Sequence, residues 1–250
     1  AGEPLLRFHD VWDKQVPSAI TLAGHRIVGF AGGTTFACDL AGKALWLRKA
    51  TWLPPIQDGS HYEIQVLPPL VANDRMYVLQ ANARAVDCLE TATGRKLWTR
   101  GIVDPRRMIG LSHGKVLLEA DNSWVALDAQ TGDVAWRNSS GPWLDACFVE
   151  SDQAAQGRTP RMIVCRREMV LQDQWRPELV WIDVANGRET GTAPLVSLTD
   201  RDPQLGPLVV AGDRLWSFSG KGQRDPKREV VELVSRASLA EPAALELASL

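Results

Sequence analysis

A short pattern recurs four times in this chain of 250 residues and restricts its fold more than any other feature. In each copy a glycine is followed by a charged residue, and in three of the four a tryptophan stands four positions after the glycine. The glycines are Gly42, Gly94, Gly132 and Gly187, and the tryptophans are Trp46, Trp98 and Trp136. The intervals between these glycines are 52, 38 and 55 residues. A period near 40 residues that loop insertions lengthen is typical of solenoids and propellers.

Short apolar runs separated by turn residues precede each of these glycines. In the third copy, Met108–Leu111 and Lys115–Leu118 are divided by Ser112-His-Gly114, and Val125–Asp128 then leads into the turn. This arrangement is typical of β-hairpins, and no helical periodicity competes with it before the last residues of the chain. Each copy therefore predicts four short strands in series.

Repeated four-stranded antiparallel sheets predict an all-β fold, a β-propeller in which each sheet is one blade. About five blades are visible. They are either part of a larger seven- or eight-bladed ring or a smaller closed ring. Residues 4–8 look like the outer strand of a preceding blade, and residues 239–247 are expected to form a divergent last strand. The predicted blades cover residues 17–50, 66–100, 107–138, 145–196 and 205–250.

The residues of the repeat have structural roles on this interpretation. The turn glycine permits a positive φ, and an acid four positions earlier, such as Asp128 or Asp183, can accept hydrogen bonds from backbone N–H groups of the turn. In the first copy the acid, Asp39, is only three positions earlier. The tryptophan is expected to lie flat between neighbouring blades and to bury most of its ring.

The third copy resembles a known family repeat. Ala126–Trp136 matches every defined position of the Ala-x-Asp-x-x-Thr-Gly-x-x-x-Trp repeat of PQQ-like propellers, and the second copy departs from it only at Cys88 and Glu90. The fourth keeps Asp183 and Gly187 but loses the tryptophan. This family includes quinoprotein dehydrogenases, which bind pyrroloquinoline quinone (PQQ) and calcium. It also includes non-catalytic scaffolds such as the outer-membrane barrel-assembly lipoprotein.

The chain lacks the accessory features that the resemblance associates with the dehydrogenases. Its cysteines are never adjacent and form no haem-attachment motif, and no histidine pair has metal-ligand spacing. No catalytic residue, metal site or cofactor is predicted, and PQQ with calcium is expected only under the oxidoreductase alternative. The sequence favours a protein without catalytic activity but leaves the question open.

Binding residues are expected in long loops on the face of the blades opposite the repeat turns, because long loops with aromatic residues are frequent binding sites. These loops are residues 51–66, 166–178 and 219–228. The alternative is that their tryptophans are tucked against the blades. The candidate residues are the exposed aromatic, histidine and arginine side chains that typically anchor contacts, namely Trp52, His61, Tyr62, Trp175 and Arg176.

A net charge of −2 and a pI near 6.1 give no reason to expect nucleic acid as a partner. No apolar run approaches the length of a membrane-spanning helix. The leading hypothesis is a non-catalytic scaffold that binds another protein or a small ligand, in an exported or envelope protein, with the periplasm implied by the resemblance alone. The alternatives are a quinoprotein oxidoreductase domain and a carbohydrate- or peptide-binding module that uses the long-loop face.

Overall fold

The computed structural model describes the strands and most of the tight turns of the chain. The described residues are 18–31, 34–49, 68–80, 84–139, 143–149, 161–171, 174–196, 209–211, 214–219, 229–235 and 245–246. All of their regular elements are strands, so the part of the chain seen here offers no helix with the length and apolar character to cross a membrane.

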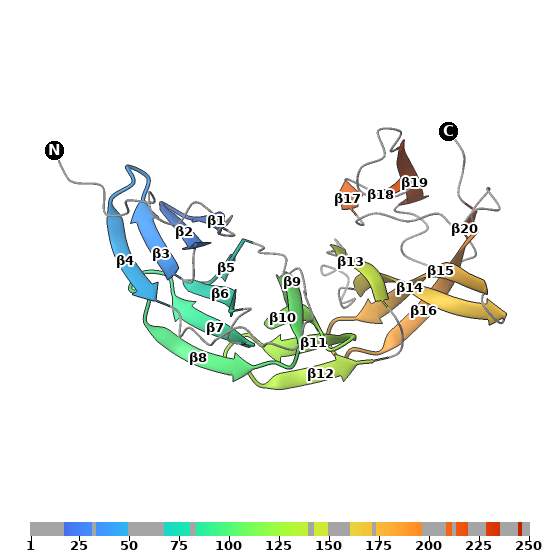
Figure 1. Ribbon diagram of the computed structural model, residues 1–250, viewed down its shortest axis with the longest axis horizontal. Helices are drawn as coiled ribbons and strands as arrows, with labels where there is room; N and C mark the ends of the chain where they lie inside the picture. Colours follow the sequence, from blue (N-terminus) through green and yellow to red (C-terminus); the bar gives the residue numbers. More distant parts are fainter. Residues whose placement is uncertain are drawn as a thin grey trace, which may run out of the picture. The chain divides into compact units, whose positions relative to one another are not determined.

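Three four-stranded sheets follow one another along the first half of the chain, and within each sheet the strands lie in sequence order (Figure 1). The first contains β1 (Ser18–Ala23), β2 (Arg26–Ala31), β3 (Thr34–Asp39) and β4 (Ala44–Lys49). The second contains β5 (Leu70–Ala72), β6 (Arg75–Gln80), β7 (Ala85–Glu90) and β8 (Lys96–Gly101). The third contains β9 (Pro105–Ser112), β10 (Lys115–Ala120), β11 (Ser123–Asp128) and β12 (Val134–Asn138).

Two further sheets follow. The fourth contains β13 (Trp143–Val149), β14 (Arg161–Leu171), β15 (Gln174–Asp183) and β16 (Glu189–Val196), with the short β20 (Leu245–Glu246) at its edge. The fifth contains β17 (Val209–Ala211), β18 (Arg214–Ser219) and β19 (Glu229–Ser235). The predicted all-β propeller with four-stranded antiparallel blades is confirmed.

The prediction for the C-terminal tail was wrong in its pairing. A strand does form there, but β20 runs parallel to β16, with Leu245 opposite Leu195, and does not complete the fifth sheet. It pairs only with Leu195 and Val196 at the end of β16, where it covers a short part of the sheet edge. Residues 4–8, expected to form an outer strand, lie outside the described residues.

The prediction of a loop at residues 166–178 was also wrong, because β14 and β15 pair there as one long hairpin (Figure 1). β14 and β15 stay paired as far as Leu171 and Gln174. The charged residues that suggested a loop lie at paired positions of the two strands, with Glu168 in register with Arg176.

The proline in this hairpin occupies a position where a strand tolerates it. Pro177 lies one residue beyond Glu178, the first residue of β15 that pairs with β16. At Pro177 the strand is therefore an edge strand on one side, and an edge is where a missing N–H costs little.

The chain divides into two compact units, and each unit contains buried apolar side chains. The chain divides into residues 1–121 with 127–134 and residues 122–126 with 135–250. In the first unit, side chains of the first and second sheets form a buried cluster of Val28, Ala37, Met76, Val78 and Leu89. In the second, fully buried side chains include Trp124 of β11 and, from β14 and β15, Met162, Ile163, Leu179, Trp181 and Ile182.

Candidate functional site

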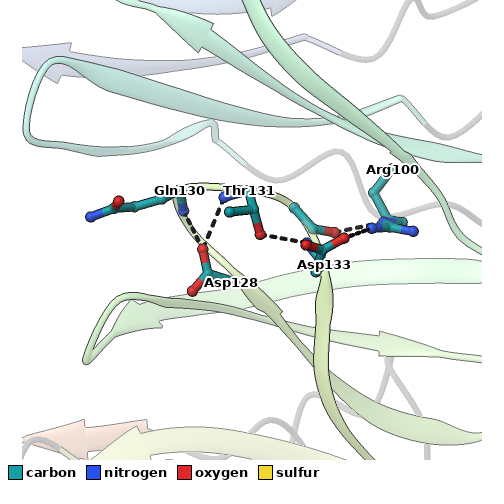
Figure 2. Close-up of polar contacts among 6 residues, drawn as sticks. Arg100, Asp128, Gln130, Thr131 and Asp133 are labelled. Carbon is teal, nitrogen blue, oxygen red and sulfur yellow. Dashed lines mark hydrogen bonds and ion pairs between the residues drawn. The ribbon is translucent and has the colours of Figure 1, made fainter.

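The best-preserved repeat turn is built around the carboxylate of Asp128 (Figure 2). Its Oδ1 accepts the N–H groups of Gln130 at 2.8 Å and Thr131 at 2.9 Å. The Thr131 hydroxyl accepts the N–H of Asp133 at 3.2 Å. Gly132 has φ +77° and donates its N–H to the Asp128 carbonyl at 2.8 Å. The acid, the threonine and the glycine thus satisfy the backbone of one tight turn.

The other copies keep this chemistry with different residues. Asp183 accepts the N–H of Ala185 at 2.7 Å, and Asn186 replaces the threonine by accepting the N–H of Arg188 at 2.9 Å. In the shorter first turn, Asp39 accepts backbone N–H groups at 2.8 and 2.9 Å. The sequence interpretation of the acid as a turn residue therefore holds in these copies.

Hydrogen bonds to the ionised form hold two of the turn acids in that form. The backbone N–H of Thr131, followed by that of Gln130, lowers the pKa of Asp128 below its usual value. For Glu90 the hydroxyl of Thr93, followed by the Arg95 guanidinium, lowers the pKa. Both groups are carboxylates at neutral pH, in which Asp128 Oδ1 accepts two backbone N–H groups and Glu90 accepts the Thr93 hydroxyl.

Each repeat tryptophan lies against the turn of the following sheet. The indole Nε1 donates to the carbonyl of the residue just after the next acid: Trp46 to Thr91 at 2.9 Å, Trp98 to Ala129 at 3.2 Å and Trp136 to Val184 at 2.8 Å. A Cβ added to the turn glycine would stand 2.6, 2.6 or 2.5 Å from the ring at Gly94, Gly132 and Gly187 respectively. The glycine is therefore required twice, by its φ and by the indole that covers it.

A third recurrent contact escaped the sequence analysis. The side chain two residues after each tryptophan donates to the carbonyl of the same turn glycine: Arg48 to Gly94 at 3.4 Å, Arg100 to Gly132 at 2.6 Å and Asn138 to Gly187 at 3.0 Å. Arg100 also forms an ion pair with Asp133 (Figure 2). The sequence pattern that could have revealed this contact is a polar residue two positions after each repeat tryptophan.

One buried carbonyl joins the second and third sheets. Besides Trp98, the Ala129 carbonyl accepts the Tyr77 hydroxyl at 3.0 Å and Arg75 Nη1 at 3.1 Å. Burial raises the pKa of Tyr77 to about 12 and the pKa of the neighbouring Cys88 thiol to about 11. Both groups are protonated at neutral pH, so Cys88 is a poor nucleophile.

A groove of about 640 Å³ lies between turns of the first and second sheets. Its lining includes His25, Asp39, Asn73 and Asp74, which lie in or beside the β1–β2, β3–β4 and β5–β6 turns. The groove therefore lies on the face formed by these tight turns, whereas the sequence analysis expected binding on the opposite face, where the long loops lie. Within the described residues, no three His, Cys, Asp or Glu side chains gather as a metal site requires.

The structure places only part of the predicted binding face. Trp52, His61 and Tyr62 lie outside the described residues. Trp175 and Arg176 stand next to each other near the turn end of the β14–β15 hairpin, opposite Met169 and Glu168.

Comparison with known proteins identifies the same architecture. The family model described as outer membrane protein assembly factor BamB matches residues 31–238. BamB from Moraxella catarrhalis is 19% identical with a TM-score of 0.54, covering 88% of this chain and 57% of its own. For a europium-containing methanol dehydrogenase the values are 13%, 0.56, 91% and 49%. For a quinohemoprotein alcohol dehydrogenase from Pseudomonas putida HK5 they are 12%, 0.51, 86% and 44%.

These solved structures are similar to the chain in fold alone, at identities between 12% and 19%. The chain spans about half of the length of these structures. No curated protein matches the sequence. The PQQ-like propeller architecture is thus common to an outer membrane protein assembly factor and to dehydrogenases, and the fold does not choose between these functions.

Proposed function

The chain belongs to the family of the outer membrane protein assembly factor BamB, and on this premise we propose that it is a non-catalytic propeller scaffold that binds another protein in the bacterial cell envelope. The observation that carries this proposal is the use made of the repeat residues. The carboxylate of Asp128 is engaged by two backbone N–H groups, and Trp98 covers the glycine of the same turn. Such residues stabilise blades, which leaves the outer surfaces for binding.

The repeat tryptophans serve as docking residues between blades in this account. Their indole N–H groups and rings are committed to the following sheet at Trp46, Trp98 and Trp136. A sheet of paired strands is a suitable base for a recognition surface, because residues held on paired strands keep a defined geometry without a ligand.

The proposed partner surface is centred on the end of the β14–β15 hairpin. β14 and β15 have 11 and 10 residues, whereas β6 and β7 of the second sheet have 6 each. The extra length extends the hairpin and brings Trp175 and Arg176 to its end. Tryptophan and arginine are frequent anchors of protein interfaces.

The oxidoreductase alternative requires PQQ and calcium. Calcium is held by several oxygen ligands, chiefly carboxylates. Among the described residues, no three His, Cys, Asp or Glu side chains gather in this way, and the turn carboxylates of Asp128 and Asp183 accept backbone N–H groups. The fit is poor in this part of the chain, and no reaction step is derived from it.

One titration distinguishes the scaffold from the oxidoreductase. The purified chain is titrated with PQQ and calcium by calorimetry, and dye-linked oxidation of alcohols and sugars is followed in the same samples. The scaffold proposal expects no stoichiometric binding and no turnover. Stoichiometric PQQ binding with dye reduction would replace it by the oxidoreductase.

The protein-binding surface is tested by site-specific photo-crosslinking in the cell envelope. A photoreactive amino acid at Trp175 should give a discrete adduct with one protein, identified by mass spectrometry. The matched control carries the same group at Lys49, an exposed position on β4. Equal labelling from both positions would contradict a surface centred on the hairpin.

A further inference from the structure

The turn between β15 and β16 contains the only asparagine of the sequence that is followed directly by a glycine. We propose that Asn186-Gly187 is a site of spontaneous deamidation, which the folded turn keeps unreactive and which opening of the turn exposes. The product does not rebuild the original turn, so the reaction releases Trp136 from this junction irreversibly.

The reaction needs only the two residues and water. The backbone nitrogen of Gly187 loses its proton and attacks Cγ of Asn186. The Cγ–Nδ2 bond then breaks, and Nδ2 leaves as ammonia after taking up a proton. Water opens the resulting five-membered imide at either carbonyl, which gives aspartate or isoaspartate. Asparagine is a chemically labile residue, and glycine favours the attack because it has no Cβ to obstruct the approach.

Hydrogen bonds engage every reacting group of Asn186 and Gly187 in the folded turn. The attacking nitrogen of Gly187 donates its N–H to the Asp183 carbonyl at 2.8 Å. Asn186 Nδ2 donates to Asp183 Oδ2 at 3.0 Å, and its Oδ1 accepts the N–H of Arg188 at 2.9 Å. The Asn186 side chain is exposed to water, so these bonds restrain it without the help of burial.

The Trp136 indole holds the same turn from the side of Gly187. A Cβ added to Gly187 would lie 2.5 Å from the ring, and the indole Nε1 donates to the Val184 carbonyl at 2.8 Å. Asn138 Nδ2 donates to the Gly187 carbonyl at 3.0 Å. The Gly187 backbone is therefore fixed while Trp136 is docked, and the rate of deamidation reports how often this junction opens.

Two other turns show what position 186 must supply. There the residue before the glycine is a threonine, and its hydroxyl accepts the N–H two positions later, at 3.1 Å for Thr93 and 3.2 Å for Thr131. A threonine has no amide to lose. Asn186 performs the same task with a labile group, so the fourth turn is the copy that this reaction can alter.

Either product removes a contact on which the fourth turn depends. Aspartate at position 186 keeps an acceptor for the Arg188 N–H but replaces the Nδ2 donor with a carboxylate oxygen beside that of Asp183. Like charges at this separation repel. Isoaspartate adds a methylene group to the backbone and changes the spacing between Asp183 and Gly187. In both cases the platform under Trp136 is disturbed.

Peptide mapping of the full chain by mass spectrometry tests whether the fold protects the site. At mildly alkaline pH, the peptide with Asn186 should deamidate at least about tenfold faster in guanidinium chloride than in native buffer. In native buffer, Trp136→Ala should speed the reaction by about tenfold or more. The matched control Trp46→Ala, which uncovers the corresponding glycine of another turn, should not.

Three outcomes of this mapping would overturn the proposal. Equal rates in denaturant and native buffer would mean that the turn gives no protection. An unchanged rate in Trp136→Ala would separate the reaction from the docked indole. Equal acceleration by Trp46→Ala would assign the reaction to global unfolding in place of opening at this junction.

Two substitutions test the consequence of the reaction separately from its rate. Asn186→Asp supplies one product directly and should speed amide exchange in residues 184–188 by about threefold or more. Asn186→Thr, which installs the residue used by the second and third turns, should leave that exchange at the wild-type rate and abolish deamidation. Wild-type exchange in Asn186→Asp, or continued deamidation of the peptide in Asn186→Thr, would contradict the proposal.

Discussion

Gly132 has a positive φ and also lies beneath the Trp98 ring, whereas Gly114 has a positive φ without a covering ring and serves as a control. Both Gly132 and Gly114 have positive φ, at +77° and +68°. An added Cβ would stand 2.6 Å from the Trp98 ring at Gly132, whereas nothing lies within 4 Å at Gly114. Backbone strain and packing can therefore be measured separately.

We predict that Gly132→Ala lowers the free energy of unfolding by about 2–4 kcal/mol, as left-handed strain adds to overpacking against the indole. Gly114→Ala, with strain alone, should cost about 1–2 kcal/mol. Urea denaturation of both variants checks this difference. Equal losses would mean that the indole does not press on Gly132.

The Asp128 carboxylate makes a pH-dependent contribution to the free energy of unfolding, and its lowered pKa determines the direction of that dependence. Its pKa is lowered in the folded chain, chiefly by the Thr131 N–H, so folding favours the ionised form. The contribution is therefore fully present above the unfolded pKa near 3.9 and is lost as the pH falls through the lower folded pKa.

We predict that Asp128→Ala is less stable than the wild type at pH 7 and that the difference narrows below about pH 4. Thermal unfolding from pH 7 to pH 2.5 measures it. A difference that stays constant over this range would show that the carboxylate charge is not what the turn uses.

At the junctions between sheets, the side chain two positions after each repeat tryptophan donates a hydrogen bond to the turn of the next sheet. We predict that Arg100→Ala, which removes the bond to the Gly132 carbonyl, costs about 1–2 kcal/mol. Arg95→Ala is the control, since Arg95 is 65% exposed and its ion pair with Glu90 is a surface pair worth little. Similar losses in chemical denaturation would remove Arg100 from the junction.

At the scale of single elements, β14 and β15 mark the limit of sequence reasoning. Turn chemistry located the tight turns well, because Gly132 and Asp128 occupy fixed positions in them. The hairpin was missed, since its strands carry charged residues and Pro177, which usually indicate a loop. Those residues fit once pairing across the hairpin and the free edge at Pro177 are known, and neither is visible in a single strand.

The hairpin also permits a test within one strand. Trp181 is 1% exposed, so Trp181→Ala should cost about 3–5 kcal/mol. We predict that Trp175→Ala, near the turn end, shifts the unfolding midpoint little and instead weakens binding of the captured partner. A large loss of stability from Trp175→Ala would make it a core residue, and the proposed surface would have to move.

For the whole molecule, the repeat was enough to predict the blades because three copies carry both the turn glycine and the tryptophan and a fourth keeps the turn. The repeat could not predict which strand residues 245–246 pair with, because their partner strand, β16, lies about 50 residues earlier in the sequence. It also could not locate function. Repeat residues such as Trp98 and Asp128 are engaged in the fold, and recognition depends on surface residues that vary freely from blade to blade.

The central claim is that indole-on-glycine contacts hold successive sheets together. A double-mutant cycle between Trp98 and Gly132 tests it most directly, because the two residues lie on different sheets and meet only at the junction. In a Trp98→Ala background, Gly132→Ala should cost only the 1–2 kcal/mol or so that strain alone imposes on Gly114→Ala. An unchanged cost of Gly132→Ala in the presence and absence of the Trp98 indole would contradict the claim.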